Sequence, residues 1–490
     1  MTRLGWAGYA WRSLLGMLGC CLALCPLQSH GQRMVFAHYM VTNQDYQGDT
    51  DPTQERKIAA YEREMREAQA VGIDGFVLNV GGWLREPYYI RYTAQIFEAA
   101  LRLNSGFKLM LSADMCCGNT AEDIEDIMRR FAGNPRYAKV YFQQQGKSVL
   151  TTFAGDKIGT DGWQQIRTDL EFGTHPSTSA EPKALRPASD PPGNAPLQVF
   201  FVPALFFDGE LPKKKNLDEA VAHWKAALDG MVYWGIAGVP GSHGALDQLP
   251  SSRYYAEALH HAGKLYVAPV CLQFWGANAN RYYEYSGATG MRAMWMDAIR
   301  VTHPEWVEII TWNDFIEGTY ISPIDDPNRY AGANFLDTTG VPRGIRGYFH
   351  SHAAATDLLK FYIAWYKTGI EPAIEHDAVY FFYRTQPKAV DAGKPSVANK
   401  FGPVDDAIYI TSNLTAAAEL RVTSGNETRT LHLPAGSSDT QTPFQVGEAP
   451  RFELLRTGKT LGTAVGNDPI TAKPVFNDFY YSSGVLTVSH

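Results

Sequence analysis

Two carboxylic acids three residues apart, Asp314 and Glu317, directly follow an apolar run at residues 307–312. Such a run is typical of a buried strand, and the end of a strand holds side chains in fixed positions. Two fixed carboxyl groups can cleave a glycosidic bond, because one protonates the leaving oxygen while the other activates water. A lone Asp-x-x-Glu is more often a helix cap or a solvated pair. The preceding strand and the flanking rings of Trp312 and Tyr320 favour a catalytic pair here.

Short apolar segments recur along the chain as far as this pair. They lie at residues 34–41, 75–80, 108–113, 148–153, 198–204, 231–236, 265–270 and 307–312. Helix-length patterns separate most of them, for example at residues 54–70, 92–103 and 121–131. Strands that are apolar on both faces and alternate with helices predict a (β/α)8 barrel, with the doubly wound α/β folds as the alternative.

The carboxyl ends of the strands carry the active site in a barrel of this kind. Polar and aromatic residues gather at these predicted ends, whereas the strand interiors are apolar. The candidate catalytic acids are Asp114, Asp314 and Glu317, and the candidate substrate-binding residues are His38, Tyr39, Asn79, Trp234, Trp275, Trp312, Asn313 and Tyr320. For Asp114 the alternative role is a loop cap, and for His38, Trp234 and Trp275 it is a place in the core. Glu308, inside its strand, is either a structural acid or a support for the site.

The pattern changes near residue 375, after which short alternating segments replace the helical periodicity. They lie at residues 378–383, 406–411, 418–422, 428–433, 443–446, 451–456 and 483–488. This arrangement predicts an all-β sandwich. The expected organisation is therefore a catalytic barrel at residues 32–374 and a β-sandwich at residues 375–490, with a proline-rich surface insertion at residues 174–194.

Residues 1–31 have the order of a secretory signal, with arginines, a short apolar run and then small polar residues. We expect a secreted or periplasmic protein, with a lipid anchor at Cys20 as the alternative. Three cysteines lie beyond this segment, Cys116, Cys117 and Cys271, so one disulfide from Cys271 to either of the others is the most that could form. The spacing of histidines and cysteines predicts no metal site, and His350-Ser351-His352 has no carboxylate beside it to complete one.

The charge of the chain gives no sign of a nucleic-acid partner. The formal net charge is −7, and the longest basic run is Lys213-Lys214-Lys215. The apolar run in the signal segment is too short for a comfortable membrane span. We expect a monomer that needs no cofactor and has a polysaccharide as its partner.

The chain resembles glycoside hydrolase family 71, the α-1,3-glucanases or mutanases. The resemblance rests on blocks that follow the order of the family, at residues 35–41 (Val-Phe-Ala-His-Tyr-Met-Val), 72–81, 108–115, 148–155 and 307–317, and on the later stretch at residues 380–388. It implies a barrel with a β-sandwich, no metal, and inverting, endo-acting hydrolysis of α-1,3-glucan. The catalytic carboxylates of the family fall on Asp314 and Glu317, and a third essential Asp falls on Asp114.

Two departures from the family pattern concern the substrate. Residues 314–318 read Asp-Phe-Ile-Glu-Gly where the family usually has Asp-Tyr-Gly-Glu-Ser, and the insertion at residues 174–194 is unusual. The sequence from Trp312 to Thr319 also resembles that of family 99-like barrels, which act on mannose-containing glycans. The alternative outside the enzymes is a non-catalytic glycan-binding barrel. Such a protein would be expected to lack a carboxylate at the predicted strand ends, and none is missing. We expect Glu317 to be the acid and Asp314 the base, roles that the sequence leaves interchangeable.

Overall fold

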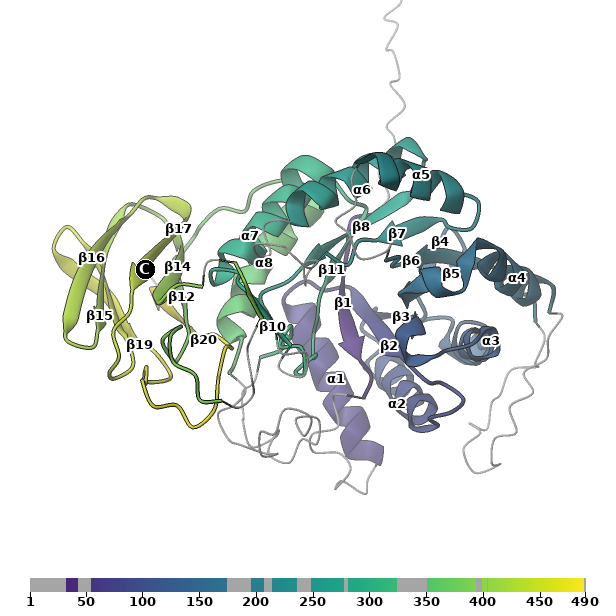
Figure 1. Cartoon of the computed structure of the whole chain (residues 1–490), viewed down its shortest axis with the longest axis horizontal. Coiled ribbons are helices and arrows are strands. Elements are labelled where there is room, and N and C mark those ends of the chain that lie inside the picture. The colour runs from purple at the N-terminus through teal and green to yellow at the C-terminus, as the bar shows by residue number, and fades with distance from the viewer. Residues whose placement is uncertain are drawn as a thin grey trace, which may run out of the picture.

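The computed structural model describes residues 32–42, 54–173, 195–206, 214–235, 248–276, 281–323, 350–393, 399–402 and 404–488. The predicted signal segment and the predicted insertion at residues 174–194 lie outside the described residues. The described part is a mixed α/β fold in which a curled sheet is surrounded by helices and continues into β-sheets at the C-terminal end (Figure 1).

Eight strands of the curled sheet run parallel. They are β1 (Met34–Met40), β2 (Gly75–Val80), β3 (Lys108–Asp114), β5 (Lys147–Phe153), β6 (Val199–Pro203), β7 (Gly230–Val232), β8 (Leu265–Val270) and β11 (Trp306–Ile309). Each overlaps one of the predicted apolar segments, so these predictions are confirmed. Their pairing order is β6-β5-β3-β2-β1-β11-β8-β7, and the short β4 (Gln143–Gln144) pairs antiparallel with β5.

The curl brings the two end strands of this order side by side. Between β6 and β7 there is one parallel bridge, from Ala204 to Val232, in place of a full ladder. Two further hydrogen bonds join the strands, because the Asp229 amide donates to the Phe201 carbonyl at 2.8 Å and the Phe201 amide donates to the Asp229 carboxylate at 2.9 Å.

Helices lie on the outside of the curled sheet (Figure 1). They are α1 (Gln54–Ala70), α2 (Tyr88–Leu103), α3 (Ala121–Phe131), α4 (Gly159–Phe172), α5 (Lys214–Trp224), α6 (Leu249–His261), α7 (Ala288–Asp297) and α8 (Ala353–Thr368). Helix α3 illustrates why these segments form helices. Thr120 and Asp123 form a capping box at its start, and Phe131 at its end stacks on Phe97 of α2 at 4.7 Å. None of the described helices is long and apolar enough to cross a bilayer.

The interior of the curled sheet is apolar at one end and polar at the other. Side chains alternate between the two faces of a strand. On β1, Phe36 belongs to the apolar cluster inside the sheet, whereas Ala37 and Tyr39 belong to the cluster between sheet and helices. His38 therefore faces the interior, nearer the carboxyl end. The same alternation places further polar residues beyond the apolar interior: Asn79 after Val77, Ser112 and Asp114 after Met110, and Glu308 after Trp306.

Two four-stranded antiparallel sheets follow α8. One has the order β17-β14-β12-β20, from β12 (Asp377–Tyr383), β14 (Ala407–Leu414), β17 (Gly436–Pro443) and β20 (Ser482–Val488). The other has the order β16-β15-β18-β19, from β15 (Ala418–Ser424), β16 (Glu427–Leu433), β18 (Arg451–Arg456) and β19 (Lys459–Val465). They share one apolar cluster, in which the rings of Phe381 and Phe452 stack at 3.9 Å.

Two of these strands differ from the prediction. A strand was expected at residues 443–446, but β17 instead ends at Pro443, and no strand was expected at β19. Both lie at sheet edges, where few side chains are fully buried and the sequence shows little apolar alternation. A third small sheet, β13-β10-β9, joins β9 (Phe274–Gly276) and β10 (Arg281–Tyr283) to β13 (Asn399–Phe401).

Candidate active site

The turn that follows β11 is tightly hydrogen-bonded and carries both acids of the predicted pair. The Thr311 and Thr319 hydroxyl groups lie 3.0 Å apart, and the Asp314 amide donates to the Thr311 hydroxyl at 2.8 Å. The Asp314 carboxylate in turn accepts from the amides of Ile316 and Glu317, each at 3.0 Å. Asp314 therefore caps the turn that presents Glu317, which fixes the two carboxyl groups relative to each other.

The two acids occupy different electrostatic surroundings. Burial and then the charge of Asp314 raise the pKa of Glu317 to about 8, opposed by Arg281 and reinforced by Asp114. Burial also raises the pKa of Asp314, but the amide hydrogen bonds and His38 oppose that rise. These donors stabilise the anion of Asp314, and the charge of Asp314 adds to the effect of burial in raising the pKa of Glu317.

Asp114 ends β3 on the same side of the sheet. One carboxylate oxygen accepts from the amides of Cys116 at 2.9 Å and Cys117 at 3.3 Å, and so caps a short 3-10 helix (Met115–Cys117). The predicted alternative role as a loop cap is thus present. The residue also contributes negative charge at Glu317, so the structure brings the three predicted acids into one electrostatic site.

His38 and Trp234 line the same polar end of the sheet interior. The Nδ1 atom of His38 lies 2.7 Å from a Glu308 carboxylate oxygen, and both side chains are buried. The ring of Trp234 stands edge-on between His38, at 4.7 Å, and Phe153, at 5.1 Å, and keeps partial solvent exposure. Asn79 is buried and makes no side-chain hydrogen bond to the residues that the structure describes, so its amide is available to a ligand.

Three predicted substrate-binding residues lie away from this site. The Tyr39 hydroxyl donates to Glu64 of α1, on the outer face of β1. The ring of Trp312 is fully buried in the apolar cluster between sheet and helices. The Asn313 side chain bonds both the amide of Met40, at 2.7 Å, and its carbonyl, at 3.0 Å, and so extends the pairing of β1 beyond its last residue.

Two more predicted residues, Trp275 and Tyr320, are fully buried against the C-terminal part of the chain. The ring of Trp275 packs on Tyr480 at 4.8 Å, while its amide donates to the Glu317 carbonyl at 2.9 Å. The ring of Tyr320 stacks on His352 at 4.2 Å. Neither ring presents a face to a ligand, because both are buried against Tyr480.

A segment just before β20 holds this turn from behind. The Tyr480 hydroxyl donates to the Phe315 carbonyl at 2.6 Å. The Gln273 side chain donates to the Gly318 carbonyl at 2.9 Å and accepts from the Tyr481 amide at 3.1 Å. Tyr480, 165 positions from Phe315, and Gln273, 45 positions from Gly318, thus bond the backbone on both sides of the candidate acid.

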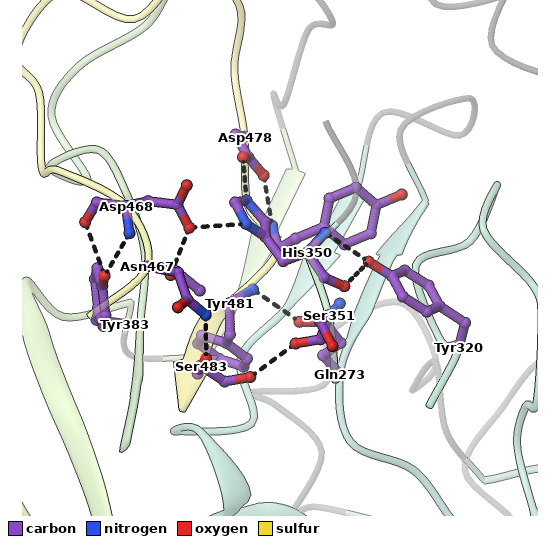
Figure 2. A network of polar contacts seen from close by, with 12 residues as sticks. Gln273, Tyr320, His350, Ser351, Tyr383, Asn467, Asp468, Asp478, Tyr481 and Ser483 are labelled. Carbon is purple, nitrogen blue, oxygen red and sulfur yellow. Dashed lines mark hydrogen bonds and ion pairs between the residues drawn. The ribbon is translucent and has the colours of Figure 1, made fainter. Parts of the chain in front are cut away.

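Figure 2 shows a buried histidine that completes this connection. His350 lies between Asp478, 2.7 Å from Nε2, and Asp468, 3.2 Å from Nδ1. Burial alone would lower the pKa of His350, but the two carboxylates raise it to about 10. The amide and carbonyl of His350 both bond the Tyr320 hydroxyl, at 3.1 and 2.8 Å. The ion pairs therefore link the C-terminal segment to Tyr320, which follows the turn that carries Asp314 and Glu317.

Sequence reasoning missed Arg281 and Tyr283 of β10. The charge of Arg281 opposes the rise in the pKa of Glu317, and burial together with the charge of Glu317 raises the pKa of Tyr283. No spacing rule selects them, because the structure brings β10 to the site through a small sheet shared with β13. The predicted helix at residues 92–103 began too late, since α2 begins at Tyr88. The predicted helix therefore left out Tyr88 and Tyr89.

The described residues contain no group of three or more His, Cys, Asp or Glu side chains placed to hold a metal ion. Cys116, Cys117 and Cys271 are all free thiols, so the disulfide considered from the sequence is not present. The residues gathered at the site offer carboxyl, amide, imidazole and aromatic groups. That combination suits acid–base chemistry on a polyhydroxylated substrate.

Comparisons with known proteins agree with this chemistry. A family model described as glycosyl hydrolase family 71 matches residues 31–488. A glucan endo-1,3-alpha-glucosidase of Schizosaccharomyces pombe is 29% identical over 464 residues, covering 94% of this chain and 96% of the relative. A mutanase of Penicillium rubens is 26% identical, covering 93% and 92%. A solved family 99 endo-alpha-mannosidase of Bacteroides thetaiotaomicron superposes with a TM-score of 0.46 at 11% identity, over 68% of this chain and 97% of that one.

The family match spans the curled sheet, the turn that carries Asp314 and Glu317, and the C-terminal sheets together. It includes all three acids of the site and the segment that holds the turn from behind. The chain belongs to glycosyl hydrolase family 71.

Proposed function

We propose that this protein is an endo-acting glycoside hydrolase that cleaves α-1,3-glucan with inversion at the anomeric carbon. The observation that carries the proposal is the pair of acids in one turn, of which Glu317 has a pKa raised to about 8. A carboxylic acid that keeps its proton at neutral pH can protonate a leaving glycosidic oxygen. The names of the Schizosaccharomyces pombe and Penicillium rubens relatives support α-1,3-glucan as the substrate.

The remaining acids take the complementary roles. Asp314 is the general base that removes a proton from the attacking water, since its carboxylate is stabilised by two amide donors. In a single displacement, water attacks the anomeric carbon from the face opposite the leaving oxygen, which receives the proton of Glu317. Asp114 contributes a negative charge that stabilises the oxocarbenium-like transition state or orients a hydroxyl group of the substrate.

The proposal also includes a closed barrel and a separate C-terminal domain. We infer that β6 and β7 close the curled sheet into a complete (β/α)8 barrel at residues 32–374, supported by the Ala204–Val232 bridge. The two C-terminal sheets then form a β-sandwich domain at residues 375–490, supported by their shared apolar cluster. Residues 1–31 direct export of a chain that acts as a monomer.

The first test is a product assay on insoluble α-1,3-glucan, with α-mannan and β-1,3-glucan in parallel. We expect soluble oligosaccharides from the α-1,3-glucan alone, and time-resolved NMR should detect the β-anomer first. Release from mannan alone, or an α-anomer as the first product, would contradict the proposal. Polymer that is retained but never shortened would indicate a binding protein instead.

Two variants assign the acid and the base. Glu317→Gln and Asp314→Asn should each slow hydrolysis of the polymer by about 10²–10⁴-fold. An α-glucosyl fluoride donor needs little protonation of its leaving group, so it should restore turnover to the Glu317 variant but not to the Asp314 variant. Azide, which needs no base, should rescue the Asp314 variant as a β-glucosyl azide. The opposite pattern of rescue would exchange the two roles. Glu375→Gln, at an exposed position, is the matched control.

A further inference from the structure

The loops that follow β2 and β3 are fixed to each other beside Asp114. The Asn119 side chain donates to the last carbonyl of β2 at 2.8 Å and to the Asp114 carbonyl at 3.1 Å. Its oxygen accepts from the Trp83 amide at 3.1 Å. One buried amide therefore joins both loops to the end of β3.

A tyrosine hydroxyl reaches into this junction. A Cβ atom on Gly81 would lie 2.6 Å from Cys117 Cβ and 3.3 Å from the Tyr89 hydroxyl, so only glycine allows the two loops to meet this closely. Burial raises the pKa of Tyr89, and the charge of Asp114 adds to that rise. Tyr89 therefore stands within the electrostatic reach of a candidate catalytic acid.

Tyr89 is paired with a second ring that is open to solvent. Tyr88 is 37% exposed, and the two ring centroids lie 4.9 Å apart with 31° between the ring planes. Neighbouring side chains on a helix ordinarily diverge, but in the first turn of α2 these rings lie together. An exposed aromatic surface of this kind offers a flat face to the C–H groups of a sugar ring.

Charged groups border the exposed ring. The Tyr88 hydroxyl donates to the Glu86 carboxylate. Arg85 donates to the Cys117 carbonyl at 2.8 Å and lies 3.4 Å from Glu86, and its side chain remains 63% exposed. These contacts orient the carboxylate and the guanidinium while leaving donors and acceptors free. Planar rings bordered by fixed hydrogen-bonding groups are what a glycan-binding surface requires.

We propose that Tyr88 and Tyr89, with Arg85 and Glu86, form a subsite for a glucosyl unit of the polysaccharide, next to Asp114 and away from the bond that is cleaved. The subsite rests on the proposed function, because its ligand is a further unit of the same chain. β2 and β3 are separated from β11 by β1 in the sheet, so a chain bound at both places extends across the carboxyl ends of these strands. The subsite selects for longer substrates.

The test compares Tyr88→Ala with Tyr254→Ala, which removes an equally exposed tyrosine (37%) from the outer helix α6. The kcat/KM is measured on α-1,3-linked gluco-oligosaccharides of increasing length and on the insoluble polymer. Loss of one stacking contact should lower the ratio of kcat/KM between the longest and the shortest substrate by about tenfold in Tyr88→Ala. Tyr254→Ala should keep the ratio of the wild type. Tyr88→Phe keeps the ring and should lose less than Tyr88→Ala.

Two results would overturn the subsite alone, and a third would overturn the proposed function with it. A length ratio in Tyr88→Ala equal to that of Tyr254→Ala would overturn the subsite while leaving the hydrolase intact. An equal loss at every length would also overturn it, since a general disturbance of the fold would produce that pattern. A wild-type protein that does not shorten α-1,3-glucan would overturn the proposed function and the subsite together.

Discussion

Replacing Glu317 by glutamine should stabilise the folded protein at pH 8 while it removes hydrolysis. The pKa of this side chain is raised from 4.5 to about 8, chiefly by burial and by the charge of Asp314. The folded state thus keeps a proton that the unfolded chain releases near pH 4.5. Between these pH values the folded state binds more protons, so the free energy of unfolding falls as the pH rises. A glutamine at position 317 does not ionise, so the fall in the free energy of unfolding that is due to Glu317 disappears.

The size of the effect follows from the same pKa. At 1.36 kcal/mol per pH unit, the difference from 4.5 to about 8 corresponds to at most roughly 5 kcal/mol. Glu317 keeps some solvent exposure and titrates together with Asp314, which reduces the expected gain to about 2 kcal/mol at pH 8. Near pH 4 both states are protonated, so the variant and the wild type should there differ by only a few tenths of a kcal/mol.

Denaturant unfolding at pH 4, 6 and 8, followed by tryptophan fluorescence, measures this difference. The midpoint of Glu317→Gln should exceed that of the wild type increasingly from pH 4 to pH 8. Glu375→Gln, which neutralises an exposed glutamate, should match the wild type throughout. A midpoint difference that is the same at all three pH values would refute the reasoning, because it would come from packing and not from the ionisation of Glu317.

Three further substitutions test other parts of the structure. His350→Gln should lower the free energy of unfolding most below pH 6.5 and progressively less towards pH 10. The two carboxylates stabilise the histidine only while it is protonated, and thermal melts across that range measure the effect. Arg384→Met leaves Glu284, 1% exposed and 2.5 Å from the guanidinium, without its cation, and should cost about 3–5 kcal/mol in denaturant unfolding. Glu308→Gln should lower kcat with little change in KM by releasing His38, while the melting temperature of the variant stays within a few degrees of the wild type.

The sequence was sufficient to locate the strands of the curled sheet and the three acids. The strands are continuous apolar runs because both faces are covered, one by the interior cluster and the other by helices. The edge strands β17 and β19 lack that signal, because few of their side chains are fully buried. Asp314 and Glu317 could be predicted as a pair because they lie three residues apart after one strand, whereas the approach of Asp114 depends on the order of the strands in the sheet.

The predicted sugar-binding rings were harder to locate, because a strand end does not say which face a side chain takes. His38 and Tyr39 are neighbours, yet the first faces the interior and the second contacts α1. Trp275 and Tyr320 lie at the expected carboxyl end, but partners from a segment near residue 480 cover them. Contacts over such sequence separations leave no trace in local periodicity.

The contact between the C-terminal segment and the turn that carries Asp314 and Glu317 has a physical reason. Two neighbouring carboxyl groups repel each other once ionised, and this repulsion adds to burial in raising the pKa of Glu317. A turn held only by its own hydrogen bonds could relieve it by opening towards water. Tyr480 and Gln273 bond the turn from the other side, at 2.6 and 2.9 Å, so opening would leave those groups unpaired. Tyr480 and Gln273 thus hold the turn in the buried position that, together with the charge of Asp314, raises the pKa of Glu317.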